Sequence, residues 1–171
     1  EGPPFGVALV TTGPGATNVI TPVAGAWIDS LPLMIVSGQV KRADRIGGRP
    51  LRQGGVQEVD VVPMVGAITK YAAVVESPDQ VGAHVDRALH EMLHGRKGPV
   101  WLDIPLDVQA ATIIPATLDR WAPRRTTTNK TGARLSKQVE GLRALVKEAE
   151  RPLILAGHGV RGSEEHTSEL Q

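Results

Sequence analysis

The chain has 171 residues, 41% of them hydrophobic and 22% charged, with a formal net charge of +1. This is the composition of a globular protein, and a charge so close to zero gives no reason to expect nucleic acid or an anionic membrane as a partner. No apolar run is long enough to span a bilayer. The absence of cysteine excludes a disulfide framework and a zinc–cysteine site, and it fits a cytoplasmic protein.

The chain opens with a predicted buried strand over residues 6–12, a β-branched apolar run that stops at a glycine. The segment 16–29 has the length of a helix, and Pro22 is expected to bend or interrupt it. A second apolar strand is predicted over 33–36. Residues 41–55 are rich in Arg and Gly, which is typical of a long loop.

The alternation continues with a short helix predicted over 59–68 and a third strand over 71–75. Ser77-Pro78-Asp79 predicts a helix start, because a hydroxyl N-cap, a proline and an acid are favoured there in that order. Apolar residues then recur at helical spacing over 81–92, and a fourth strand is predicted over 100–104. Strands alternating with helices predict a doubly wound parallel α/β sheet.

The pattern dissolves over residues 110–134, whose prolines, arginines and threonines predict an interdomain linker. An amphipathic helix over 135–149 and a strand over 152–156 then predict that residues 135–162 begin a second α/β domain. Residues 163–171 carry no apolar stripe and fit, in a single frame, the translation of a common sequencing adapter. We expect this tail to be an artefact.

The strand-to-helix turn from Thr11 to Asn18 is the segment best suited to bind a ligand. It follows the carboxyl end of a parallel strand, where α/β folds bind ligands, and its glycines allow close backbone approach. By spacing it narrowly misses the dinucleotide fingerprint, since Asn18 stands where the third glycine belongs. Spacing alone leaves a ligand site and a tight turn without a ligand equally open.

Residues Thr11 to Asn18 closely resemble the T/S-G-P-G-x-x-N turn of the pyrimidine-binding domain in thiamine diphosphate enzymes. Further blocks follow in the order seen in the acetolactate synthase branch of that family. These blocks are Asp29-Ser30-Leu31-Pro32-Leu33, Ser37-Gly38-Gln39-Val40, Val56-Gln57-Glu58, Ile68-Thr69-Lys70, Gly98-Pro99-Val100 and Asp103-Ile104-Pro105. The resemblance implies a partial pyrimidine-binding domain over 1–109 and the start of the family's central domain over 135–162.

The resemblance also implies positions for the site residues. Cofactor contacts are expected at Thr11, Gly13, Pro14, Gly15, Asn18 and Gln57. Val56 and Lys70 are expected along the substrate channel, and Val56 replaces the usual Phe, which leaves the exact substrate open. Gly157, His158 and Gly159 resemble a flavin-contacting turn, and a simple strand-end turn is an equal alternative.

By the same resemblance, the parent protein is a 2-oxo acid decarboxylase or carboligase that acts on a substrate such as pyruvate, in branched-chain amino acid biosynthesis. It would use thiamine diphosphate, Mg²⁺ and in some members FAD, as a homodimer or tetramer. The activating glutamate and the metal ligands are expected outside this fragment, so the chain retains no catalytic residue and is expected to be inactive alone. The alternative is a non-catalytic nucleotide-binding or regulatory α/β module.

Two other features suggest sites of lower specificity. His90-Glu91-Met92-Leu93-His94 matches the H-E-x-x-H zinc protease motif, but both histidines fall opposite the helix's apolar stripe and no third ligand follows. A solvated helix face is therefore the favoured interpretation. The basic residues of the 41–55 loop could contact a phosphate or flavin, although nearby acids favour a solvated loop. They are Lys41, Arg42, Arg45, Arg49 and Arg52.

Overall fold

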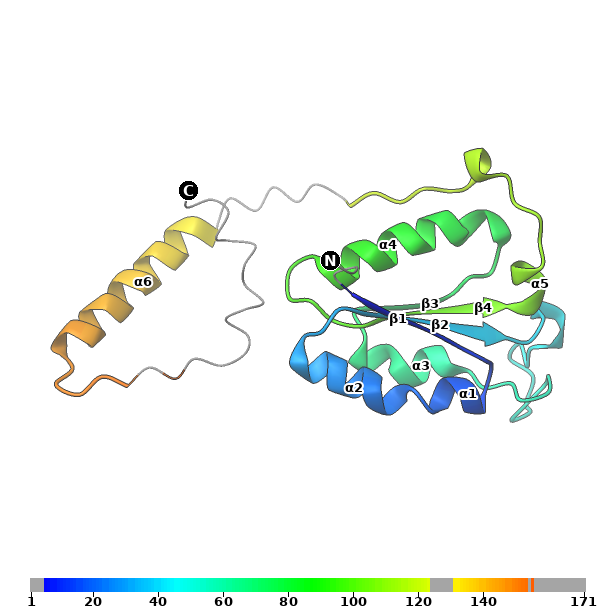
Figure 1. Ribbon diagram of the computed structural model, residues 1–171, viewed down its shortest axis with the longest axis horizontal. Coiled ribbons are helices and arrows are strands. Elements are labelled where there is room, and N and C mark those ends of the chain that lie inside the picture. Colours follow the sequence, from blue (N-terminus) through cyan, green and yellow to red (C-terminus); the bar gives the residue numbers. More distant parts are fainter. Residues whose placement is uncertain (1–4, 124–130, 154, 156–171) are drawn as a thin grey trace. The chain divides into compact units, whose positions relative to one another are not determined.

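The computed structural model describes residues 5–123, 131–153 and 155 (Figure 1). Residues up to Pro123 belong to one compact unit, and helix α6 (Thr131–Glu148) belongs to a second. The first unit contains the sheet and the whole of the candidate site. No helix in the described part of the chain combines the length and apolar character needed to cross a membrane.

Four parallel strands form a single sheet, which confirms the predicted fold class. In chain order the strands are β1 (Gly6–Val10), β2 (Leu33–Gln39), β3 (Tyr71–Val74) and β4 (Val100–Pro105). Their order across the sheet is β1-β2-β4-β3, so β2 and β4 are central and β1 and β3 form the edges. Because all four strands are parallel, their carboxyl ends meet at one edge of the layer.

Helices cover both faces of this sheet (Figure 1). One face carries α1 (Pro14–Thr17), α2 (Ile20–Asp29) and α3 (Val61–Val65), and the other carries α4 (Val81–Leu93). A short helix, α5 (Leu106–Gln109), follows β4 directly. Single 3₁₀ turns occur at Arg42–Asp44, Gly66–Ile68, Pro78–Gln80 and Pro115–Thr117.

The two helical layers create two buried cores, and successive residues of each central strand alternate between them. Ile35 and Trp101 pack with α1, α2 and α3, whereas Met34, Val100 and Leu102 pack with α4. This period of two is the pleat of a strand buried on both sides. The first core comprises Ala16, Val23, Ile35, Val61, Val65 and Trp101, and the second Met34, Ala88, Met92, Val100 and Leu102.

The break in the first helical segment lies elsewhere than predicted. The segment divides at Asn18-Val19, between α1 and α2, and Pro22 sits in the first turn of α2. A proline is tolerated there because the amides of a first turn have no acceptor within the helix. Strand β2 is also longer than the predicted 33–36, because Gly38 and Gln39 remain paired with β4.

Ser77 does not cap a helix with its side chain, contrary to the prediction. The chain makes a 3₁₀ turn over Pro78–Gln80 before α4, held by a 3.1 Å hydrogen bond from the Gln80 amide to the Ser77 carbonyl. In the second unit, Pro152, Leu153 and Leu155 do not form the predicted strand, while residues 154 and 156 lie outside the described residues. The tail 163–171 lies outside them as well.

A buried and an exposed methionine should respond differently to substitution by alanine. Met92 is fully buried and Met64 is 52% exposed. Met92→Ala should lower the free energy of unfolding by about 2–5 kcal/mol, because it leaves a cavity under α4. Met64→Ala should change it by less than about 0.5 kcal/mol. Urea denaturation of the two variants would measure both effects, and equal effects would contradict this description of the core.

Candidate functional site

The candidate site lies where the carboxyl ends of β1, β2 and β4 meet. A cavity of about 540 Å³ opens there, within the size range of small-molecule sites. Its lining comes from the ends of three strands and from α5: Leu9, Val10, Thr11, Thr12, Val36, Ser37, Gly38, Gln39, Val40, Ile104, Leu106 and Gln109. The topology thus gathers residues that are up to about a hundred positions apart in the sequence.

The Gly13 turn packs directly against the backbone of Gln57. Gly13 has φ +59°, and a Cβ built there would lie 1.9 Å from the Gln57 carbonyl oxygen. Gln57 itself has φ +59°, a conformation that residues other than glycine rarely adopt. The structure therefore brings together two segments that the sequence placed at the cofactor, and it explains why glycine is needed at position 13.

The turn presents its outer face to solvent. Thr11, Pro14 and Asn18 are exposed, while Gly13 is buried. A Cβ at Gly15 would lie 2.5 Å from the Thr11 methyl carbon, so a side chain at position 15 would force the Thr11 side chain to move. Gly13 and Pro14 carbonyls accept hydrogen bonds from the amides of Thr17 and Asn18, at 2.9 and 3.2 Å. These bonds fix the start of α1 below the exposed face.

The remaining predicted positions divide between the two ends of the sheet. Val56 is 83% exposed beside Gln57 and lines a neighbouring cavity of about 480 Å³ with Val40 and Leu106. Lys70 immediately precedes β3, so it lies at the opposite end of the sheet and is not part of this cluster. Gly157, His158 and Gly159 lie outside the described residues.

Beneath the cavity lies a buried polar network centred on Asp103, which is 1% exposed. Ser37 Oγ donates to Asp103 Oδ1 at 2.5 Å, and Gln39 Nε2 donates to Asp103 Oδ2 at 2.9 Å. Trp101 Nε1 in turn donates to Ser37 Oγ at 2.8 Å. Burial raises the pKa of Asp103 above its ordinary value, against the hydrogen bonds from Ser37 and Gln39.

Gln39 extends this network to both loops of the site. Its Nε2 also donates to the Val59 carbonyl at 2.9 Å, and its Oε1 accepts from Thr12 Oγ1 at 3.2 Å. Residues 41–58 form the long loop between β2 and α3, called the 41–58 loop below. Gln39 therefore joins Val59, which directly follows this loop, to the turn after β1. Sequence reasoning assigned no role to Ser37, Gln39 or Asp103, although polar residues at the ends of two apolar strands were a usable signal.

Glu58 holds the 41–58 loop in place. Its carboxylate accepts backbone N–H groups from Ile46 at 2.7 Å, Gly54 at 2.7 Å and Gly55 at 2.9 Å. Burial opposes ionisation of Glu58, but these three hydrogen bonds and the charge of Arg45 outweigh it and lower the pKa of the carboxyl group. The loop thus folds around a buried carboxylate that directly follows Gln57.

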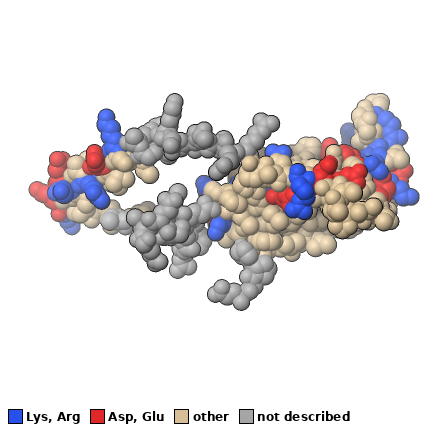
Figure 2. Space-filling view, turned by 90° about the horizontal axis from the view of Figure 1, so that it is seen from above, with Lys and Arg blue, Asp and Glu red and all other residues tan. Residues whose placement is uncertain are grey.

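The basic residues of this loop are mostly used within the protein. Arg42 pairs with Asp107 at 2.7 Å, and Arg45 pairs with Glu76 at 2.6 Å. Arg49 donates to the Ile46 and Arg45 carbonyls. In Figure 2, Lys and Arg side chains gather at the end of the domain where this loop lies, with Asp and Glu among them. Arg42 and Arg45 therefore fasten the loop to the segments that follow β4 and β3, and Arg49 holds the loop to itself.

The H-E-x-x-H motif does not form a zincin-like arrangement. The rings of His90 and His94 stack with their centroids 4.0 Å apart, and His94 lies beyond the last residue of α4 with an extended backbone. Within residues 5–123, 131–153 and 155, no group of three or more His, Cys, Asp or Glu residues is placed to hold a metal ion.

Residues 4–64 match the family described as thiamine pyrophosphate enzyme, N-terminal TPP binding domain. This segment contains both the Gly13 turn and the loop that carries Gln57. With the parallel sheet and the cavity at its carboxyl edge, the match defines the chain as a member of the thiamine pyrophosphate enzyme family.

Within that family the chain is homologous to acetolactate synthase large subunits. It is 36% identical over 155 residues to acetolactate synthase isozyme 2 large subunit of Escherichia coli, covering 91% of this chain and 26% of that protein. It is 34% identical over 164 residues to acetolactate synthase large subunit of Corynebacterium glutamicum, covering 94% and 24%. Acetolactate synthase of Arthrospira platensis is 35% identical over 154 residues, covering 90% and 26%. The chain spans about a quarter of the length of these relatives.

The contact between Gly13 and Gln57 predicts that Gly13→Ala is severely destabilising. The added methyl group would collide with the Gln57 carbonyl and force a positive φ on alanine, at a cost of about 3 kcal/mol or more. Gly66→Ala is the control, because Gly66 has a helical backbone and open space around its Cα. It should be neutral or stabilising by up to about 1 kcal/mol. Similar losses of thermal stability in both variants would contradict the close packing of the two segments.

The Glu58 contacts predict an acid-sensitive loop. Because the folded-state pKa is lowered below 4.5, the stabilisation is present above that pH and is lost as the pH falls through the folded value. Glu58→Gln should cost about 1–3 kcal/mol at pH 7, since an amide group satisfies the three N–H donors poorly. The same substitution at exposed Glu148 should have little effect. The measurement is the free energy of unfolding from pH 7 to pH 3, where a parallel decline for wild type and Glu58→Gln would contradict the assignment.

Proposed function

We propose that this chain supplies the pyrimidine-binding side of a thiamine diphosphate site in a 2-oxo acid decarboxylase or carboligase of the acetolactate synthase type. The observation that supports this most directly is the packing of the Gly13 turn on Gln57 at the carboxyl edge of a parallel sheet. That edge is where α/β sheets bind ligands, and both segments lie within the residues matched to the TPP-binding domain.

The exposed face of this turn suits the aminopyrimidine half of the cofactor. Gly13 and Gly15 have no side chain and leave the backbone open to a planar ring, and Thr11, Pro14 and Asn18 border it from solvent-exposed positions. When bound, thiamine diphosphate supplies an electron sink for cleaving or forming the bond next to a carbonyl group. The chain's own contribution would be to orient the ring and, through the exposed Gln57, to offer a hydrogen bond to the bound substrate.

Val56 is proposed to shape the substrate pocket. Its side chain is 83% exposed and directly precedes Gln57, so it would contact whatever lies over the turn. A valine there leaves more space than the phenylalanine usual in acetolactate synthases. Which 2-oxo acid besides pyruvate the parent accepts would depend on this position.

The other parts of the reaction are assigned to sequence beyond these 171 residues. We propose that the activating glutamate and the ligands of Mg²⁺ are contributed there. We also propose that the cofactor-binding site is formed between two subunits of a homodimer or tetramer. FAD binding and a cytoplasmic location remain predictions. Residues 110–134 are proposed to link this domain to a central domain that begins at 135–162. The acetolactate synthase relatives favour this catalytic parent over a non-catalytic nucleotide-binding module.

The proposal predicts an effect of Gln57→Ala on the activity of the full-length protein. Loss of one neutral hydrogen bond to the reacting complex should lower kcat/KM for pyruvate by about tenfold, which corresponds to about 1.4 kcal/mol. Gln80→Ala is the matched control, since Gln80 is exposed in a 3₁₀ turn outside the site. The measurement is acetolactate formation with thiamine diphosphate and Mg²⁺. Equal rates for wild type and Gln57→Ala would refute the role of Gln57.

The 171-residue chain alone should release no carbon dioxide from pyruvate under the same conditions. The part proposed to lie here positions the cofactor and supplies neither the activating carboxylate nor metal ligands. Turnover by the isolated chain would show that the division of roles is wrong, whereas activity only in the full-length protein would support it.

A further inference from the structure

One buried side chain is bonded to both segments of the candidate cofactor site. Gln39 is the last residue of the central strand β2 and is 5% exposed. On one side it bonds Thr12, which directly precedes Gly13. On the other side it bonds the carbonyl of Val59, two residues after Gln57. The Gln39 side chain therefore spans the same two segments whose backbones meet at Gly13 and Gln57.

The amide group of Gln39 has all of its hydrogen-bonding partners within the protein. Nε2 donates to the Val59 carbonyl and to Asp103 Oδ2, both at 2.9 Å. Oε1 accepts from Thr12 Oγ1 at 3.2 Å and from the Val40 amide at 2.9 Å. A primary amide has two hydrogens to donate and two lone pairs on its oxygen, so these four bonds use its full capacity. Gln39 can thus influence a ligand only through the segments that it holds.

The Gln39 amide is anchored from the core of the sheet. Asp103 Oδ1 accepts from Ser37 Oγ at 2.5 Å, and Ser37 Oγ accepts from Trp101 Nε1 at 2.8 Å. Asp103 and Trp101 are 1% and 0% exposed, and the bonds between Asp103, Ser37 and Gln39 join β4 to β2. Val59, in contrast, lies in no helix or strand. Its position therefore depends on bonds such as the one from Gln39.

We propose that Gln39 is a positioning residue of the cofactor site, which sets the place of the Gln57 side chain over the Gly13 turn by holding Val59. This inference rests on the proposed function, because it assumes that cofactor and substrate lie over these two segments. Without the Val59 bond the loop end is free to shift and Gln57 moves with it. A displacement of about 1 Å in an active site can lower the rate about 100-fold.

A pair of substitutions separates the loop contact from the buried contact. Gln39→Glu places a carboxylate against Asp103 and removes both donated bonds. In the double variant Gln39→Glu/Asp103→Asn, the new amide donates to the new carboxylate, which restores the bond between β2 and β4 with reversed polarity. The carboxylate at position 39 still accepts from Thr12 and Val40, but it has no hydrogen for the Val59 carbonyl. The double variant therefore loses the Val59 contact specifically.

The test compares stability, turnover and hydrogen exchange in the full-length protein. Gln39→Glu should lower the melting temperature, because two carboxylates are buried side by side, and the double variant should recover most of that loss. The kcat of the double variant for pyruvate, at saturating thiamine diphosphate and Mg²⁺, should nevertheless stay about tenfold or more below wild type. Backbone amides of residues 46–58 should exchange faster than in wild type, whereas those of β2 and β4 should remain protected.

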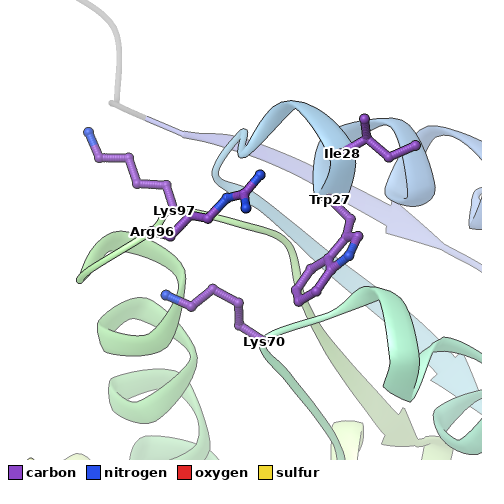
Figure 3. A pocket seen from close by; sticks show the side chains of 5 residues that line it. All are labelled: Trp27, Ile28, Lys70, Arg96 and Lys97. Carbon is purple, nitrogen blue, oxygen red and sulfur yellow. The ribbon is translucent and has the colours of Figure 1, made fainter. Parts of the chain in front are cut away.

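Lys97→Gln is the control for charge, since it changes the net charge in the same direction as Gln39→Glu. Lys97 lines a separate cavity of about 420 Å³ at the amino ends of the strands (Figure 3), and its substitution should leave kcat and loop exchange unchanged. The other residues that line this cavity are Trp27, Ile28, Lys70 and Arg96.

Two results would overturn the inference. Recovery of kcat together with the melting temperature would mean that Gln39 has only a structural role, and unchanged exchange of residues 46–58 would mean that it does not hold the loop. A double variant as unstable as Gln39→Glu would contradict the Asp103 anchor and overturn it as well. If the wild-type protein shows no turnover of pyruvate that depends on thiamine diphosphate, the proposed function fails instead, and loop exchange alone then decides whether Gln39 positions the Gln57 segment.

Discussion

The carboxyl edge of the sheet depends on one buried carboxylate. Asp103 accepts hydrogen bonds from Ser37 and Gln39, so it fastens the two central strands to each other where they end. Burying a charge is unfavourable unless it is fully hydrogen-bonded, and both carboxylate oxygens here have a donor. Gln39 carries the effect outward, to Thr12 in the turn after β1 and to Val59 at the end of the long loop. The positions of both candidate cofactor segments follow from this network.

Above the network, the backbones of the Gly13 turn and of Gln57 approach each other closely. Gly13 and Gln57 both adopt positive φ, and the contact between them leaves no room for a side chain at position 13. The strained backbone of Gln57 persists only where surrounding contacts fix it. The three N–H bonds of Glu58 and the ion pairs of Arg42 and Arg45 provide those contacts. A loop rich in Arg and Gly is thereby ordered, although its regular structure is limited to the 3₁₀ turn at Arg42–Asp44.

The two ends of the sheet differ in chemistry because different parts of the chain reach them. The carboxyl edge collects hydroxyls, amides and a glycine from the ends of β1 and β2 and from α5, which suits a neutral heterocycle. The amino edge collects cations from the segments before β3 and β4, beside the indole of Trp27. Lys70 belongs to the second group, although the family resemblance had placed it along the substrate channel. The parallel topology makes the difference, since residues before and after a strand lie at opposite edges.

The sequence by itself determined the element order and the parallel sheet, and its resemblance to the family assigned the Gly-Pro-Gly turn and the Gln57 segment to the same cofactor. Short apolar runs between glycines and prolines suffice for the first two, and a series of motif blocks in one order suffices for the third. Only the tertiary structure decided that Gly13 touches Gln57, that Asp103 is the buried centre of the site, and that Lys70 lies beside Trp27. Only the tertiary structure likewise revealed the helix break at Asn18-Val19 and the absence of a side-chain cap from Ser77. Packing and hydrogen bonding between distant segments override local preference. Contacts of this kind join residues about 40 to 70 positions apart, and no local pattern encodes them.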